Sequence, residues 1–238
     1  MVIRTAILVD GGFYRKKAKN IFGDKSPQER ADELEEYCKL HLKEHDAEIY
    51  LYRIFYYDCP ASNKNIFHPL TKKNVDLRKS PSYKWSNDFL RFLKKRRKFA
   101  VRLGRLSDNE AQYSLSSEAT RKLLNGTTDV SQLTESDFEL NMKQKSVDMK
   151  LGLDISTMAL KKQVDQIILI AGDSDFVPAA KLARREGVDF ILDSMGSHIN
   201  DDLMEHIDGL RNKTYEYKKV PKKAKTAPKK AQQTVIDN

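Results

Sequence analysis

Four short apolar runs, separated by helical patterns, restrict the fold of this chain more than any other feature of its sequence. The runs are rich in β-branched and aromatic residues, which is typical of strands. Between them, apolar residues recur at the spacing of a helix face. Strands that alternate with helices form a mostly parallel sheet with helices on both faces, so we expect an α/β domain of the α/β/α type. The runs are IRTAILV (3–9), AEIYLYRIFYY (47–57), QIILIA (166–171) and VDFILDS (188–194).

We expect one domain over residues 1–212, with inserted loops near 60–84 and 107–143. The inserts are polar and show no clear period, and long loops in compact domains are often functional. Within this region, FAVRLGRL (99–106) and AQYSLS (111–116) predict two strands around a turn. Helices are expected over residues 26–45, 85–98, 147–164, 174–186 and 200–210.

The end of the chain has a different composition from the rest. Residues 213–238 hold eight lysines against two acidic residues, Glu216 and Asp237, and so carry most of the net charge of +9. Such a segment has almost nothing to bury, and we expect it to be a disordered tail. A basic tail suits a polyanionic partner through phosphate contacts, and on its own it is equally explained as an aid to solubility.

Length and composition predict a soluble cytoplasmic protein. The 238 residues suffice for one sizeable core, and no apolar run approaches the length of a membrane span. The N-terminal segment does not have the form of a signal peptide. The two cysteines, Cys38 and Cys59, lack C-x-x-C spacing, so we expect small core residues and neither a disulfide nor a zinc site. Oligomeric state stays open, a homodimer included.

Four aspartates are expected to meet at one edge of the sheet. Asp10 closes the first strand, Asp173 and Asp175 follow QIILIA, and Asp148 begins the helix that leads into that strand. Neighbouring strand ends lie about 5 Å apart, so these carboxylates would repel one another unless protons or a cation intervened. Hard oxygen ligands favour Mg²⁺ or Mn²⁺. Taken singly, Asp175 is better explained as a helix N-cap and Asp10 as a turn residue, and it is the combination of several aspartates at matching strand ends that favours a metal site.

Three segments together resemble the NYN domain, a branch of the PIN-like nucleases. They are ILVDGGF, KSVDMKLGLDI and ILIAGDSDFVPAAKLARREGVDFIL. The resemblance implies a Rossmann-like α/β/α sandwich with an acidic Mg²⁺ or Mn²⁺ site and metal-dependent cleavage of RNA. By motif, it implies that Asp10, Asp148 and Asp173 hold the cation. Asp175 would be a further ligand or a base that orients water.

The chain departs from the family pattern after its first acid. Many members carry asparagine a few residues later, where this chain has Phe13 and Tyr14, and Ala171 stands where serine is usual. This removes a polar contact to substrate. Asp154 lies about 120° around the helix from Asp148 and is a candidate to hold a metal ligand in place without contacting the ion itself. Candidates for phosphate contacts are Lys145 and the basic run Lys94, Lys95, Arg96, Arg97 and Lys98, a run that is equally explained as a solvated helix end.

Three other functions compete with the nuclease. A phosphatase of the haloacid-dehalogenase type needs a second acid two residues after Asp10, where this chain has Gly12. HLKEH, with His41, Glu44 and His45, fits an inverted zinc-peptidase pattern, yet buried and satisfied histidines are the better reading. The serious alternative is a module that binds RNA or protein on the same fold with little turnover.

Overall fold

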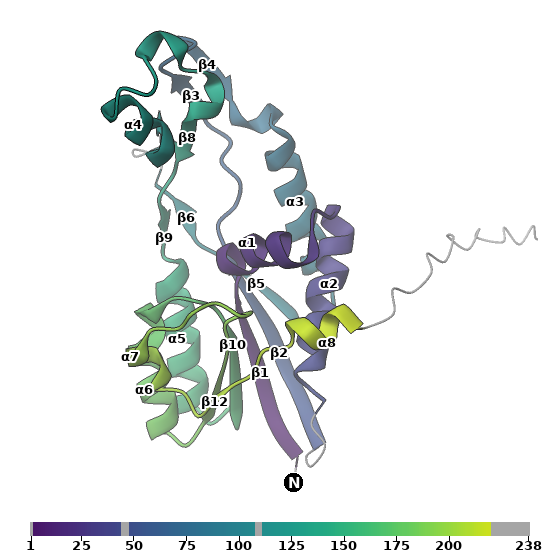
Figure 1. Ribbon diagram of the computed structural model, residues 1–238. Coiled ribbons are helices and arrows are strands. Elements are labelled where there is room, and N and C mark those ends of the chain that lie inside the picture. The colour runs from purple at the N-terminus through teal and green to yellow at the C-terminus, as the bar shows by residue number, and fades with distance from the viewer. Residues whose placement is uncertain (1, 44–47, 108–110, 220–238) are drawn as a thin grey trace, which may run out of the picture.

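The computed structural model describes residues 2–43, 48–107 and 111–219 and has one central sheet of six parallel strands (Figure 1). The strand order is β12-β11-β10-β1-β2-β5, so the chain adds strands outward from β1 in both directions. All five pairings within the sheet are parallel. The strands are β1 (Val2–Asp10), β2 (Glu48–Asp58), β5 (Phe99–Leu103), β10 (Gln166–Ile170), β11 (Asp189–Asp193) and β12 (Gly209–Leu210).

Helices cover both faces of this sheet, which confirms the predicted α/β/α class. Alternate residues of β1 enter different cores: Ile7 and Val9 pack on one face, Ala6 and Leu8 on the other. This is the period-two alternation of a strand that is buried on both sides. The first face is covered by α1 (Gly11–Phe22), α2 (Pro27–Leu40) and α3 (Pro81–Lys94), and the second by α5 (Val147–Leu160) and α6 (Val177–Arg185).

Local capping explains where two of these helices begin. Ser26 and Glu29 form a capping box at α2, followed by Pro27 in the first turn, as the Ser-Pro start predicted. The helix ends at Leu40, earlier than expected. Helix α1 was not expected, because D-G-G reads as a turn. It starts directly at the end of β1, where the side chain of Asp10 accepts the backbone N–H of Phe13.

The inserted segments are structured and not the loops that the sequence suggested. The described residues 60–80, 107 and 111–143, here called the inserted lobe, lie beyond the carboxyl ends of the strands (Figure 1). The predicted pairing of 99–106 with 111–116 is wrong: β5 joins the central sheet, and β7 pairs with β8. The lobe holds the hairpins β3 (Asn65–His68)–β4 (Lys73–Asp76) and β7 (Gln112–Leu115)–β8 (Phe138–Asn141), the helix α4 (Ser117–Leu124), and three 3₁₀ turns, η1 (Leu77–Lys79), η3 (Val130–Gln132) and η4 (Glu135–Asp137).

Long-range aromatic contacts hold the lobe together. The His68 ring lies 4.5 Å from that of Tyr113 and 5.1 Å from that of Phe138, so each hairpin packs on the other. A two-residue ladder, β6 (Arg105–Leu106) with β9 (Gln144–Lys145), connects the lobe to the start of α5.

The C-terminal part differs from expectation at two places. The helix expected over 200–210 is the short α7 (Asp201–Met204), followed by β12. Residues 213–219 of the expected tail include α8 (Thr214–Lys219), whose Tyr217 ring packs at a tilt against that of Phe22, with ring centroids 4.9 Å apart. Residues 220–238 of that tail lie outside the described residues.

Two further expectations can be compared with the structure. Cys38 and Cys59 are both buried and free, as predicted. In the described ranges, no helix is both long and apolar enough to cross a membrane.

Candidate active site at the carboxyl edge of the sheet

Asp10 occupies the last position of β1 and caps helix α1. Its Oδ1 atom accepts a hydrogen bond from the Phe13 backbone N–H at 3.1 Å. Burial raises the pKa of Asp10 to about 6, against this hydrogen bond, and repulsion from Asp148 and Asp58 raises it further. A carboxyl group with this pKa is partly protonated near neutral pH unless a cation stabilises its charge.

The other three acids converge on the same edge from two neighbouring elements. Asp148 lies in the first turn of α5 and is exposed. Its pKa is raised by partial burial and then by repulsion from Asp173 and Asp175. Those two residues are also exposed and follow β10, where the Asp173 Oδ1 atom accepts the Asp175 backbone N–H at 3.2 Å. Asp148 thus interacts electrostatically with Asp10, Asp173 and Asp175, so all four predicted acids lie at one edge of the sheet.

The donor set fits a hard divalent cation by its chemistry. It consists of carboxylates alone, and their mutual repulsion is the kind that a bound cation removes. Within the described part of the chain, however, no three His, Cys, Asp or Glu side chains stand together as ready metal ligands. Asp148, Asp173 and Asp175 are exposed, so rotation about their side-chain bonds is sterically open.

A fifth acid at this edge, Asp58, was missed in the sequence. It ends β2 beside Asp10 and is only 2% exposed. The guanidinium of Arg15 lies 2.9 Å from its Oδ1 atom, and the Tyr56 hydroxyl donates to its Oδ2 atom at 2.8 Å. The rule that identified Asp10, a carboxylate at the end of an apolar run, applies equally to YYD and would have found Asp58.

The ring of Phe13 packs against the loop that carries Asp173. It lies so close to Gly172 that a Cβ atom at that position would be 2.4 Å from a ring carbon. A side chain at position 172 would clash with the Phe13 ring in this orientation, so the contact depends on glycine there. The structure thus places a half-buried aromatic ring against the loop that carries Asp173 and Asp175.

The candidate supporting residue Asp154 contacts none of the four acids through its hydrogen bonds. Its Oδ2 atom accepts from the Tyr57 hydroxyl at 2.8 Å and from Arg102 Nε at 3.1 Å. These contacts join α5 to β2 and β5. Lys145 is exposed on β9, between the inserted lobe and the start of α5. It therefore lies at the carboxyl edge of the sheet, as the acids do.

The basic run 94–98 does not reach the acidic edge. It precedes β5, and because β5 runs parallel to β1, the run lies at the amino edge of the sheet, a strand length away. Arg96 pairs with Asp32 at 2.5 Å and also with Glu35, which joins α3 to α2. The ammonium group of Lys98 lies 3.9 Å from the centre of the Tyr50 ring. Arg96 and Lys98 thus make structural contacts.

The first histidine of the peptidase pattern is buried and is hydrogen-bonded through one of its two ring nitrogens, while its Nδ1 atom has no partner among the described residues. His41 is completely inaccessible, and its Nε2 atom lies 2.9 Å from the Asp193 Oδ2 atom. The Tyr37 hydroxyl donates to the same oxygen at 2.5 Å. This confirms the core role predicted for His41. Glu44 and His45 lie outside the described residues.

Comparison with known proteins supports the resemblance seen in the motifs. The family model of the NYN domain matches residues 63–210, which is more than half of the chain. The matched range includes Asp148, Asp173 and Asp175, whereas Asp10 precedes it. Searches of the curated proteins and of the solved structures gave no match.

Proposed function

The chain belongs to the NYN domain family and has a PIN-like nuclease fold, and from this premise we propose that it is a metal-dependent nuclease whose substrate is RNA. The observation that carries the proposal is the convergence of four carboxylates from three elements on one edge. The pKa values of Asp10 and Asp148 are raised partly by their acidic neighbours. Perturbed groups gathered at the carboxyl ends of parallel strands are typical of a functional site.

In this proposal, Asp10, Asp148 and Asp173 hold Mg²⁺ or Mn²⁺, and Asp175 either ligates the ion or orients water. When bound, the ion would lower the pKa of a water molecule and neutralise charge on the phosphate. Asp10 is held at the start of α1 by its N-cap hydrogen bond. The exposed acids approach from α5 and the loop after β10.

The decisive experiment is hydrolysis of a labelled single-stranded RNA by the full chain. We expect cleavage with Mg²⁺ or Mn²⁺ and none after chelation. Asp148→Asn should abolish cleavage, while Asp202→Asn, an exposed aspartate of α7, serves as the matched control and should leave it intact. Cleavage that survives chelation or Asp148→Asn would contradict the proposed mechanism.

One observation favours the alternative, an RNA-binding module with little turnover. The Phe13 ring fills the space beside Gly172, where many family members offer a polar side chain. The substitution Phe13→Asn distinguishes the two functions. If the aromatic ring limits turnover, Phe13→Asn should raise the rate of cleavage at unchanged RNA affinity. If the chain is only a binding module, wild type and variant should both bind RNA and release no product.

A further inference from the structure

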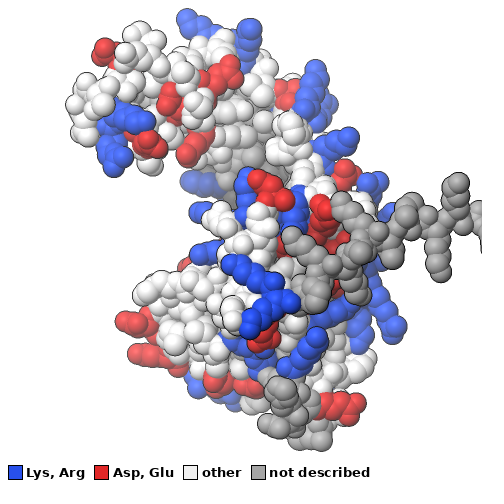
Figure 2. All heavy atoms as spheres, turned by 45° about the vertical axis from the view of Figure 1, so that its right-hand side comes forward, with Lys and Arg blue, Asp and Glu red and all other residues white. Residues whose placement is uncertain are grey.

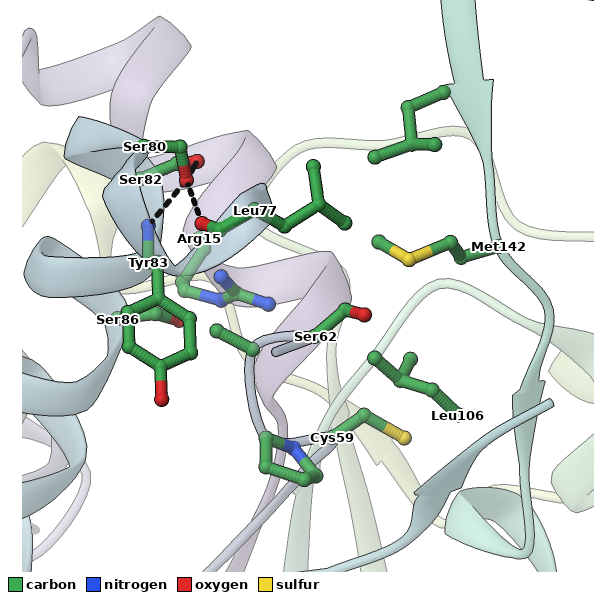
Figure 3. A pocket seen from close by; sticks show the side chains of 13 residues that line it. Arg15, Cys59, Ser62, Leu77, Ser80, Ser82, Tyr83, Ser86, Leu106 and Met142 are labelled. Carbon is green, nitrogen blue, oxygen red and sulfur yellow. Dashed lines mark hydrogen bonds between the residues drawn. The ribbon is translucent and has the colours of Figure 1, made fainter. Parts of the chain in front are cut away.

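A cavity of about 200 Å³ lies between the inserted lobe and the core, next to the acidic edge (Figure 3). Arg15, on α1, forms part of its lining and also binds Asp58. Asp58 in turn lies close enough to Asp10 to affect its pKa. The cavity is therefore joined to the proposed active site through Arg15 and Asp58.

The two sides of the cavity have different chemistry. One side presents the Arg15 guanidinium, the ring of Tyr83 and serine hydroxyls at the start of α3, whereas the opposite side presents Leu106 of β6 and Met142 of the inserted lobe (Figure 3). Ser62 of the lobe also lines the cavity. These groups match the parts of a nucleotide. The phosphate pairs with arginine, and the base stacks on the ring and offers polar edges to the hydroxyls.

Ser86 of α3 also lines the cavity and is 8% exposed. Its hydroxyl is not one of the buried side-chain atoms that lack a hydrogen-bond partner, so it is open to solvent and to a ligand in the cavity. By contrast, the Ser80 hydroxyl already has hydrogen-bond partners, because it donates to the Leu77 carbonyl and accepts the Tyr83 N–H.

We propose that this cavity binds one nucleotide of the RNA strand, adjacent to the phosphodiester group that lies at the acidic edge. The inference rests on the proposed function for the identity of the strand. The volume is below the range of about 300–1,000 Å³ that holds drug-sized ligands, a class that includes a whole nucleotide, so the cavity would enclose the base and leave the rest of the nucleotide at its opening. Figure 2 shows the surface narrowing between lobe and core, with Lys and Arg side chains along this narrowing. That charge would guide the strand past the cavity.

The test measures binding in chelator, so that it does not depend on cleavage. The four nucleoside 5′-monophosphates, inorganic phosphate and a trinucleotide are titrated into the full chain by calorimetry. We expect at least one mononucleotide to bind tenfold or more tightly than phosphate, and the trinucleotide to compete with it. Met142→Trp, which fills the cavity from the lobe, should weaken both nucleotides at least tenfold. Leu133→Trp, at a similarly half-buried lobe residue outside the lining, should not.

Each result decides for or against the proposal. Mononucleotides that bind no better than phosphate, or that ignore Met142→Trp, would overturn it, as would a trinucleotide insensitive to the filled cavity. If Met142→Trp unfolds the protein, Tyr83→Leu removes the stacking face from the core side and should weaken both nucleotides at least threefold. Binding that persists in a chain without nuclease activity would refute the proposed function and not the cavity.

Discussion

Aspartates stand at the carboxyl ends of four adjacent strands, but the two inner and the two outer ones have opposite surroundings. The outer carboxylates are buried and fully paired: Asp58 binds Arg15 and Tyr56, and Asp193 binds Tyr37 and His41. The inner ones, Asp10 on β1 and Asp173 after β10, accept backbone N–H groups and have no cationic partner among the described residues. All four aspartates thus share a position at a strand end, and the two without a cationic partner among the described residues are the two that we propose as metal ligands.

The largest effect expected from this comparison is on cleavage. Asp173→Asn removes a proposed ligand, and we expect RNA cleavage with Mg²⁺ to fall about a thousandfold, or about 4 kcal/mol of transition-state stabilisation. The fold should be unaffected, and the melting temperature without metal should rise because a repulsive charge is removed. Melting curves with Mg²⁺ and with chelator, read beside single-turnover rates, provide the measurement. Equal stabilisation of both proteins by Mg²⁺ would show that Asp173 is not a ligand.

The outer pair should behave in the opposite way. Asp193→Ala leaves the Tyr37 hydroxyl and the His41 ring buried without their partner, so the free energy of unfolding should fall by about 3 kcal/mol. Urea unfolding of this variant and of Asp173→Ala gives the contrast. If both lose the same stability, the distinction between inner and outer aspartates is wrong.

A smaller effect, on stability against pH, follows from Asp10. Its pKa is raised in the folded state from the ordinary value near 4 to about 6. The associated stability is complete below about pH 4 and is lost as the pH rises through about 6, by about 3 kcal/mol. Thermal melting in chelator should show this decline, and Asp10→Asn, which keeps an N-cap side chain, should lack it. Saturating Mg²⁺ should reverse the trend, since the ion binds the carboxylate.

The smallest effect concerns charge outside the site. Removal of residues 220–238, which hold five of the lysines, should weaken RNA binding severalfold and flatten its salt dependence without changing the rate of the bound complex. The cut is placed after Lys219 because α8 packs on the core. Filter binding over a series of salt concentrations measures both quantities. An unchanged salt slope would mean that these lysines do not contact phosphate.

The sequence by itself determined the central sheet, because each of its longer strands is a local apolar run, and period-two burial needs no distant information. It also placed Asp10, Asp148, Asp173 and Asp175 at one edge, since parallel strands bring their carboxyl ends together. Two further features follow from the same rule but were not predicted. Asp58 ends β2, and the run 94–98 precedes β5 and so lies at the amino edge of the sheet.

Only the tertiary structure decided which carboxylates are paired and how the inserted segments fold. Asp58 is neutralised by Arg15, 43 positions earlier, and Asp193 is held by Tyr37, 156 positions earlier. The lobe depends on contacts such as that of His68 with Tyr113 and Phe138, which join two separate hairpins. Short polar strands have little local preference, so their pairing is settled by side chains far away in the chain. The cavity exists only where lobe and core meet, and no single stretch of sequence encodes it.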